Sequence, residues 1–140
     1  MEDDLYNNRY RTFDELYLYC YRVASVVGLM CIEIYGYEDV RAKKFAESWG
    51  IFMQLTNVLR DVGEDIQRNR VYLPLDELES NGINEPELNG DVVLNPTWEP
   101  YVHHYAKRAR TYLEEAKQLL PLLPRRTRYS PAAMIAFYDK

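Results

Sequence analysis

Two long stretches of the chain are dominated by apolar residues at helical spacing. The first, residues 11–36, opens with Thr12 and Glu15, a pair typical of a capping box, and ends at Gly36. Apolar positions nearly surround a helix drawn through it, so we expect a central helix rather than a surface one. The second stretch, residues 40–68, is rich in good helix formers and contains no proline, which predicts one further long helix.

The rest of the chain alternates between proline-rich loops and shorter helical patterns. Residues 74–100 hold four prolines and read as loop, with one short helix at 75–80. Apolar spacing predicts another helix over 101–120, and Ser130-Pro131 is typical of a helix start. No segment alternates as a strand does, so the predicted fold class is all-α, in one domain.

Charge and cysteine content narrow the classes of partner and compartment. Lys and Arg number 17 against 22 Asp and Glu, a net charge of -5 without a basic stripe, so no nucleic-acid partner is predicted. Cys20 and Cys31 lack the spacing of a zinc site and are expected to be buried thiols in a reducing, cytoplasmic setting. We expect neither signal peptide nor membrane span, which leaves peripheral membrane association open.

One polar stripe stands out on the second predicted helix. At 100° per residue, five of its side chains fall within an arc of roughly 80°: Gln54, Asn57, Asp61, Asp65 and Arg68. Such a stripe could simply face solvent. However, Asn and Asp disfavour helix interiors, and two carboxylates four residues apart repel each other.

A divalent cation would remove that repulsion. Magnesium prefers oxygen ligands and is commonly held by one or two carboxylates together with phosphates, which suits Asp61 and Asp65. The amides of Gln54 and Asn57 could orient a water or a phosphate oxygen. Three arginines near the same helix end could bind a diphosphate in bidentate fashion: Arg60, Arg68 and Arg70. An Asp-x-x-x-Asp pair alone is common by chance, so the longer constellation carries the prediction.

Two runs of residues resemble signatures of a known family. The run QLTNVLRDVGEDIQRNRVYLP, residues 54–74, is similar to the second aspartate-rich motif of squalene, phytoene and presqualene diphosphate synthases. The run YCYRVASVVGLM, residues 19–30, resembles the other signature of these head-to-head prenyl synthases. Ser25 stands where the family usually carries glycine or another small residue, a departure that should change little.

The resemblance implies a fold, a reaction and a cofactor. The fold would be an isoprenoid synthase-type helical bundle, in which magnesium ions bridge two aspartate-rich motifs to substrate diphosphates. The reaction would join two farnesyl or geranylgeranyl diphosphates head to head through a cyclopropylcarbinyl diphosphate, in squalene, hopanoid or carotenoid biosynthesis. NADPH would be required only if the parent enzyme is a full squalene synthase.

The resemblance also implies roles for individual residues. Asp61 and Asp65 would be metal ligands and catalytic, and Tyr19 would act within the reaction cavity. Seven further residues would bind substrate. Four would lie at the diphosphate: Gln54, Asn57, Arg60 and Arg70. Three would lie along the prenyl chain: Val23, Ala24 and Gly28. Without the family, the small residues among them would be assigned to close helix packing.

The first aspartate-rich motif of such enzymes has no counterpart here. We therefore expect residues 1–140 to be the C-terminal portion of a synthase domain, truncated at both ends and inactive alone, with Met1 resembling an internal methionine and Glu2–Asp4 matching a family segment. One alternative is a non-catalytic, synthase-like subunit. Another is a relative of the head-to-tail prenyl synthases or terpene cyclases, whose motifs are usually denser.

Overall fold

The computed structural model describes residues 8–89 and 95–138. The acidic segment at Glu2–Asp4 lies outside these residues. Throughout the described ranges the regular structure is helical, and the one strand-like pairing there is a single bridge between Arg9 and Val71. The predicted all-α fold class is therefore confirmed.

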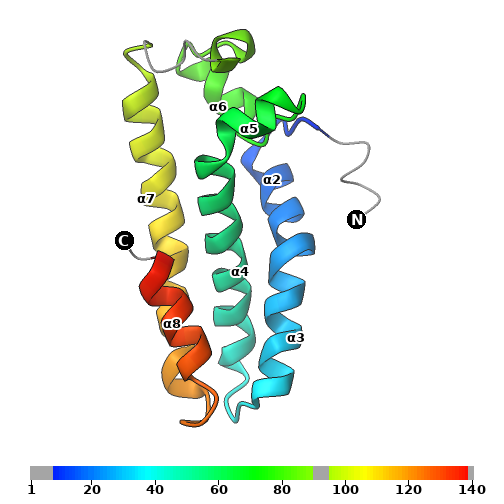
Figure 1. Ribbon diagram of the computed structural model, residues 1–140, viewed down its shortest axis with the longest axis vertical. Helices are drawn as coiled ribbons and strands as arrows, with labels where there is room; N and C mark the ends of the chain where they lie inside the picture. Colours follow the sequence, from blue (N-terminus) through cyan, green and yellow to red (C-terminus); the bar gives the residue numbers. More distant parts are fainter. Residues whose placement is uncertain (1–7, 90–94, 139–140) are drawn as a thin grey trace. The chain divides into compact units, whose positions relative to one another are not determined.

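The chain divides into two compact units. The first comprises residues 1–19 and 56–107, and the second comprises residues 20–55 and 108–140. In chain order the helices have the following bounds (Figure 1): α2 Phe13–Cys20, the π-helix η1 Tyr21–Ser25, α3 Val26–Tyr35, α4 Arg41–Arg60, α5 Val62–Gln67, α6 Leu75–Ser80, the 3-10 helix η2 Glu85–Asn89, α7 Trp98–Lys117, the 3-10 helix η4 Leu120–Leu122 and α8 Tyr129–Tyr138.

In the first unit, the extended segment before α2 is bound to the chain that leads into α6. The amide of Val71 donates to the carbonyl of Asn8 at 2.9 Å, and that of Leu75 donates to the carbonyl of Tyr10 at 3.0 Å. Backbone groups of the loop are thereby satisfied without a sheet. Apolar and aromatic side chains form the core of this unit: Tyr10, Leu16, Val58, Tyr72, Leu73, Leu78, Ile83, Tyr101 and Tyr105.

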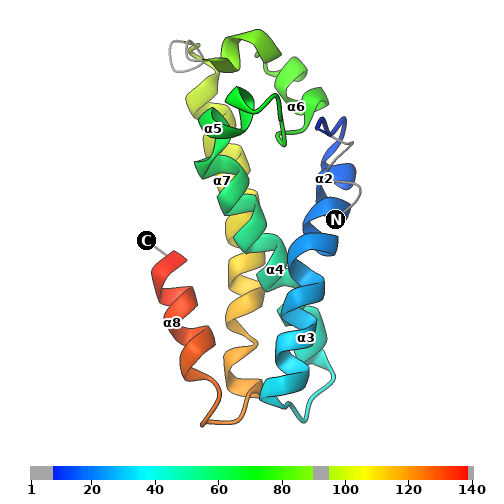
Figure 2. The same cartoon turned by 45° about the vertical axis from the view of Figure 1, so that its right-hand side comes forward.

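In the second unit, α4 is the buried element. The Ser48 hydroxyl donates to Glu115 of α7 at 2.7 Å, and the Phe52 ring meets that of Tyr138 of α8 edge-on at 6.2 Å. On another side, the Ser25 hydroxyl of η1 donates to the carbonyl of Glu47 at 2.9 Å. Figures 1 and 2 both show α3 running alongside the first part of α4.

The first predicted helix has the expected extent but not the expected position. Residues 13–35 are helical throughout, with a π-helical segment in the middle, and Gly36 ends the helix at a φ of 80°. The expectation of a central helix was wrong. Val27, Met30 and Ile34 are 54%, 63% and 81% exposed, because within the second unit this helix packs against α4 with its small residues and leaves its larger apolar side chains outside.

The same helix also corrects the expectation that no segment could span a membrane. Residues 13–35 are long and apolar enough to do so by length and composition. A core helix of a water-soluble protein meets the same criterion, but such a helix is mostly buried, whereas most of this one is not buried. Ser25 within this helix is fully buried and bonded to the Glu47 carbonyl of α4, which is the behaviour of a bundle helix.

The second predicted helix is interrupted. It was expected to run unbroken over 40–68, but α4 ends at Arg60 and α5 begins at Val62. Asp61 between them has φ -98° and ψ 9°, outside the helical region, although its amide still bonds to the Asn57 carbonyl at 2.9 Å.

The remaining helices agree with the prediction more closely. The short helix at 75–80 is α6, with the predicted bounds. Helix α7 begins and ends three residues before the predicted 101–120, and α8 begins one residue before Ser130, so Ser130 is a helical residue rather than the cap.

Candidate functional site

Asp61 lies at the point where α4 gives way to α5. Its carboxylate accepts two hydrogen bonds from its neighbour, one from Arg60 Nε and one from Arg60 Nη2, each 2.7 Å long. These bonds hold the pKa of Asp61 below its usual value, so the carboxylate is charged at neutral pH. With 35% of its side chain exposed, Asp61 remains accessible to a ligand from solvent.

Asp65 follows one turn later and has a different environment. Partial burial raises the pKa of its carboxyl, and the negative charge of Asp61 raises it further. The charges of Arg70 and Arg68 act in the opposite direction. The two carboxylates therefore repel each other as the sequence predicted, and the two arginines oppose the effect of that repulsion on the pKa of Asp65.

Asn57 places an unsatisfied polar atom one turn before Asp61. Its Oδ1 is buried and has no hydrogen-bond partner among the described residues. A buried amide oxygen without a partner loses its hydration and gains nothing in return, at a cost of about 1–3 kcal/mol. Such an atom near two carboxylates suits a site that is completed by a ligand or a coordinated water.

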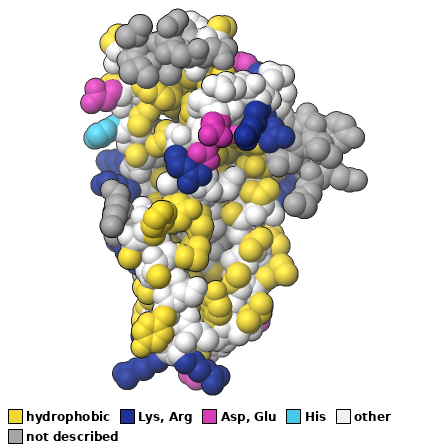
Figure 3. Space-filling view, in the orientation of Figure 1, with side chains coloured by type: hydrophobic (Ala, Val, Ile, Leu, Met, Phe, Trp, Pro, Cys, Tyr) yellow, Lys and Arg dark blue, Asp and Glu magenta, His cyan; other side chains and the backbone are white. Residues whose placement is uncertain are grey.

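Two arginines follow Asp65 in the chain, Arg68 at the end of α5 and Arg70 in the turn after it. Arg68 lies 3.6 Å from Glu64 across one helical turn, and Arg70 follows Asn69, whose φ of 58° ends the helical path. The Arg70 amide donates to the Asp65 carbonyl at 2.8 Å. In the space-filling view, acidic and basic side chains lie side by side over α5 (Figure 3).

Three tyrosines form a cluster in the same unit. Tyr19 lies against Tyr10 and Tyr72, with 5.2 Å between ring centroids in each pair, and Tyr10 stacks on Tyr72 at 5.6 Å. The sequence singled out Tyr19 alone among the three. It missed Tyr10, because the extended segment that carries it is too short to show a periodicity.

Four of the predicted substrate-binding residues belong to the second unit: Val23, Ala24, Gly28 and Gln54. Ala24 and Gly28 lie where helices approach closely. A Cβ added at Gly28 would be 2.9 Å from the Ala46 carbonyl oxygen, and one added at Gly50 would be 2.7 Å from the carbonyl carbon of Ala24. These contacts are those of helix packing, the alternative that the residues alone suggested. Gln54 is half-buried on α4, three residues before Asn57.

The described residues fit part of a magnesium site. Asp61 and Asp65 supply hard oxygen ligands of the kind that magnesium takes, and their mutual repulsion would be relieved by a cation. No group of three or more His, Cys, Asp or Glu able to hold a metal occurs within residues 8–89 and 95–138. Two carboxylates alone suit a magnesium ion that shares its remaining positions with waters and phosphates.

Comparison with known proteins identifies the family. A family model described as squalene/phytoene synthase matches residues 1–140. The chain belongs to the squalene/phytoene synthase family. Its chloroplastic phytoene synthase relatives include one from an Oncidium hybrid cultivar, 43% identical over 99% of this chain and 35% of the relative, and phytoene synthase 1 from Zea mays, 41% identical over the same shares.

Solved structures give the same result for the fold. A dehydrosqualene synthase crystallised with a ligand superposes with a TM-score of 0.86 at 30% identity, covering 98% of this chain and 48% of that one. The squalene synthase HpnC from Alicyclobacillus acidocaldarius superposes at 0.85 with 22% identity, covering 98% and 50%. The isoprenoid synthase-type fold is thus confirmed. The chain spans about a third of the length of these curated relatives and about half of these solved ones.

Proposed function

We propose that this chain supplies one metal-binding and diphosphate-binding half of a head-to-head prenyl synthase. The observation that carries the proposal is the combination of two repelling carboxylates, Asp61 and Asp65, with the unpartnered Oδ1 of Asn57 one turn before them. A structural helix gains nothing from this combination. A magnesium-diphosphate site can use all three groups, the carboxylates as metal ligands and the amide oxygen to orient a coordinated water.

The chain's own residues have separable roles in this proposal. Asp61 and Asp65 hold Mg²⁺, which when bound neutralises charge on a departing diphosphate. Arg60 and Arg70 contact diphosphate oxygens, and for Arg60 this means leaving its exposed pair with Asp61. Asn57 and Gln54 orient a phosphate oxygen or a water. Tyr19, held by two neighbouring rings, presents an aromatic face or a hydroxyl to the reacting prenyl group.

The substrates in this proposal are allylic prenyl diphosphates such as farnesyl or geranylgeranyl diphosphate. Val23, Ala24 and Gly28 would lie along the prenyl chain, in addition to the helix packing that involves Ala24 and Gly28. The phytoene synthase relatives favour a carotenoid precursor as product, and a reductant such as NADPH would enter only if the product is squalene. The relatives are chloroplastic enzymes, whereas for this chain a cytoplasmic or peripheral membrane location stays a prediction.

A chimeric enzyme tests the role of the two aspartates. The matching third of a phytoene synthase is replaced by residues 1–140, and product formation from geranylgeranyl diphosphate and Mg²⁺ is measured. Asp61→Asn and Asp65→Asn should each lower kcat by about 100-fold or more, because each removes charge stabilisation from the transition state.

Glu64→Gln is the matched control, since it removes one carboxylate charge from the exposed side chain next to Asp65. It should leave kcat within about twofold. Unchanged turnover in both aspartate variants would instead assign the chain to the non-catalytic, synthase-like class.

A second assay uses the 140-residue chain by itself. It should form no product from farnesyl or geranylgeranyl diphosphate with Mg²⁺, because Asp61 and Asp65 supply one aspartate-rich motif where the reaction is expected to need two. Turnover by the isolated chain would refute this part of the proposal.

A further inference from the structure

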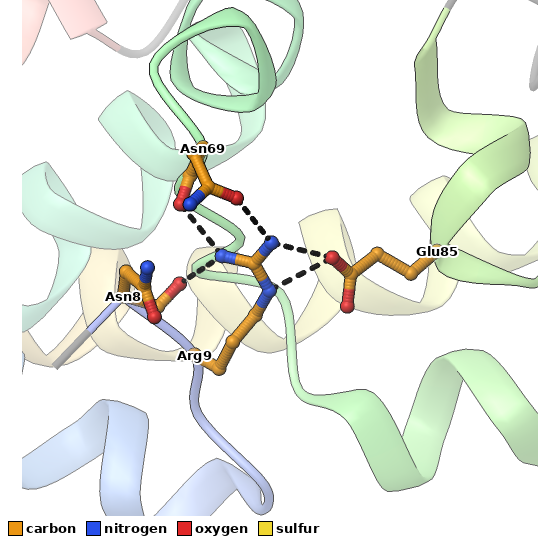
Figure 4. A network of polar contacts seen from close by, with 4 residues as sticks. All are labelled: Asn8, Arg9, Asn69 and Glu85. Carbon is orange, nitrogen blue, oxygen red and sulfur yellow. Dashed lines mark hydrogen bonds and ion pairs between the residues drawn. The ribbon is translucent and has the colours of Figure 1, made fainter.

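Arg9 uses all its hydrogen-bonding capacity within the protein. A guanidinium has five N–H groups, and each of those of Arg9 has an acceptor. Nε donates to Glu85 Oε1 at 2.9 Å, and Nη2 donates to the same oxygen and to Asn69 Oδ1 at 3.0 Å. Nη1 donates to the carbonyls of Asn69 at 2.7 Å and Asn8 at 2.8 Å. Figure 4 shows the guanidinium between Glu85 on one side and the two asparagines on the other.

Because every N–H group of Arg9 is already used, Arg9 has no donor left for a ligand. A pocket of about 380 Å³ is lined by Arg9, Glu85 and Asn69 together with Ile66, Val71 and Pro86. An anion entering it would meet a cation already neutralised by Glu85 and without a spare donor. Arg9 is therefore better suited to holding protein segments in place than to binding a ligand.

Asn69, the residue that Arg9 binds twice, directly follows the segment that carries Asp61 and Asp65. It has a left-handed backbone, φ 58°, which a non-glycine residue adopts at some cost. On one side its own amide bonds to the Ile66 carbonyl at 2.9 Å. On the other, the Arg70 amide bonds to the Asp65 carbonyl at 2.8 Å. The turn at Asn69 thus fixes the backbone of Asp65 and the start of Arg70.

We propose that Arg9 is a positioning residue for the metal-binding segment. Its hydrogen bonds link the left-handed turn at Asn69 to Glu85 and to the segment before α2. They thereby fix the positions of Asp65 and Arg70. This inference rests on the proposed function for its metal-binding part. Charge-assisted bonds of this kind are about twice as strong as neutral ones, and two of the five that Arg9 makes go directly to Asn69.

Hydrogen exchange tests the positioning without requiring metal or activity. In Arg9→Gln, the amides of Arg70 and Val71 should exchange about tenfold faster than in the wild type, because the turn then opens more often. Arg11→Gln is the matched control, since Arg11 lies two residues away, is exposed and loses the same charge. It should leave both rates unchanged. Equal rates in Arg9→Gln and wild type overturn the inference.

Binding of Mn²⁺ with inorganic diphosphate tests the link to the metal site. Free Mn²⁺ is followed by electron paramagnetic resonance as the 140-residue chain is titrated into it. Arg9→Gln should weaken binding about tenfold, Arg9→Lys should recover part of the loss by restoring charge and some donors, and Arg11→Gln should bind as the wild type does. Thermal unfolding of each variant shows whether it remains folded.

The outcomes separate the two proposals. Loss of binding in Asp65→Asn together with weakened binding in Arg9→Gln supports both. Faster exchange in Arg9→Gln with unchanged Mn²⁺ binding overturns positioning of the metal site and leaves only a structural clamp. Absence of Mn²⁺-diphosphate binding by the wild-type chain counts against the proposed function, while hydrogen exchange still decides whether Arg9 holds the turn.

Discussion

The carboxyl pKa values of Asp61 and Asp65 are displaced in opposite directions. The bidentate pair with Arg60 lowers the pKa of Asp61, whereas partial burial first, and the charge of Asp61 second, raise the pKa of Asp65. An ion pair as exposed as this contributes only about 0–1 kcal/mol to stability. Exchanging it for contact with a metal ion or a diphosphate therefore costs little. Arg60 can thus keep the Asp61 carboxylate charged without preventing it from binding a ligand.

The thiols of Cys20 and Cys31 should differ in reactivity because they differ in burial. Burial raises the pKa of Cys20 to about 12, so at pH 8 roughly one molecule in ten thousand carries the thiolate that reacts. We expect a disulfide reagent to modify only the half-buried Cys31 in the folded protein, and both thiols after denaturation. Cys31→Ser should leave no rapid reaction, and fast modification of that variant when folded would contradict the assignment.

At the scale of helices, close packing in the second unit depends on missing side chains. A Cβ on Gly50 would lie 2.5 Å from both Cα and N of Ser25, atoms of a backbone that cannot rotate away. The neighbouring backbone is the π-helix η1, whose wider turn places Ser25 against α4. Single π-turns inside α-helices often occur at functional sites, and here the turn begins two residues after Tyr19.

Two glycine substitutions should therefore have opposite effects on stability. Gly50→Ala should lower the free energy of unfolding by about 1–3 kcal/mol, since backbone must move to admit the new methyl group. Gly63→Ala should raise it by about 0.5–1 kcal/mol, because that glycine lies in α5 with no atom within 4 Å of the added Cβ. Urea denaturation of both variants checks the signs. A neutral Gly50→Ala would show that the two helices are not in this contact.

Among the helices, the sequence predicted some boundaries and missed others. Helix spacing and the stops at Gly36 and Pro74 predicted the all-α class and α6 with its bounds. The break at Asp61 left no mark in that spacing, because α5 continues the same apolar pattern while one residue leaves the helical region. Arg9 could not be assigned either. Its partner Glu85 is 76 residues away, and only folding brings them together.

At the scale of the whole molecule, the described residues leave one apolar helix face uncovered. Helix α3 exposes Val26, Val27, Met30 and Ile34 on one face, although apolar side chains usually gain by burial. An exposed apolar face of this kind marks an interaction surface. The solved relatives contain about as much chain again as this one matches. Their unmatched half is the occupant that we expect for this face.

Complementation tests that expectation. The unmatched half of the dehydrosqualene synthase is expressed with this chain, and we expect the two to copurify and to form product that neither forms alone. Met30→Asp with Ile34→Asp should abolish copurification, because burying two unpaired carboxylates in an apolar contact costs several kcal/mol. Gln118→Asp adds charge at an exposed position of the same unit and should copurify normally. Circular dichroism shows whether each variant keeps its helices. If the variant with both substitutions on α3 still copurifies, the contact lies on another face. If Gln118→Asp fails to copurify, added charge alone disrupts the complex.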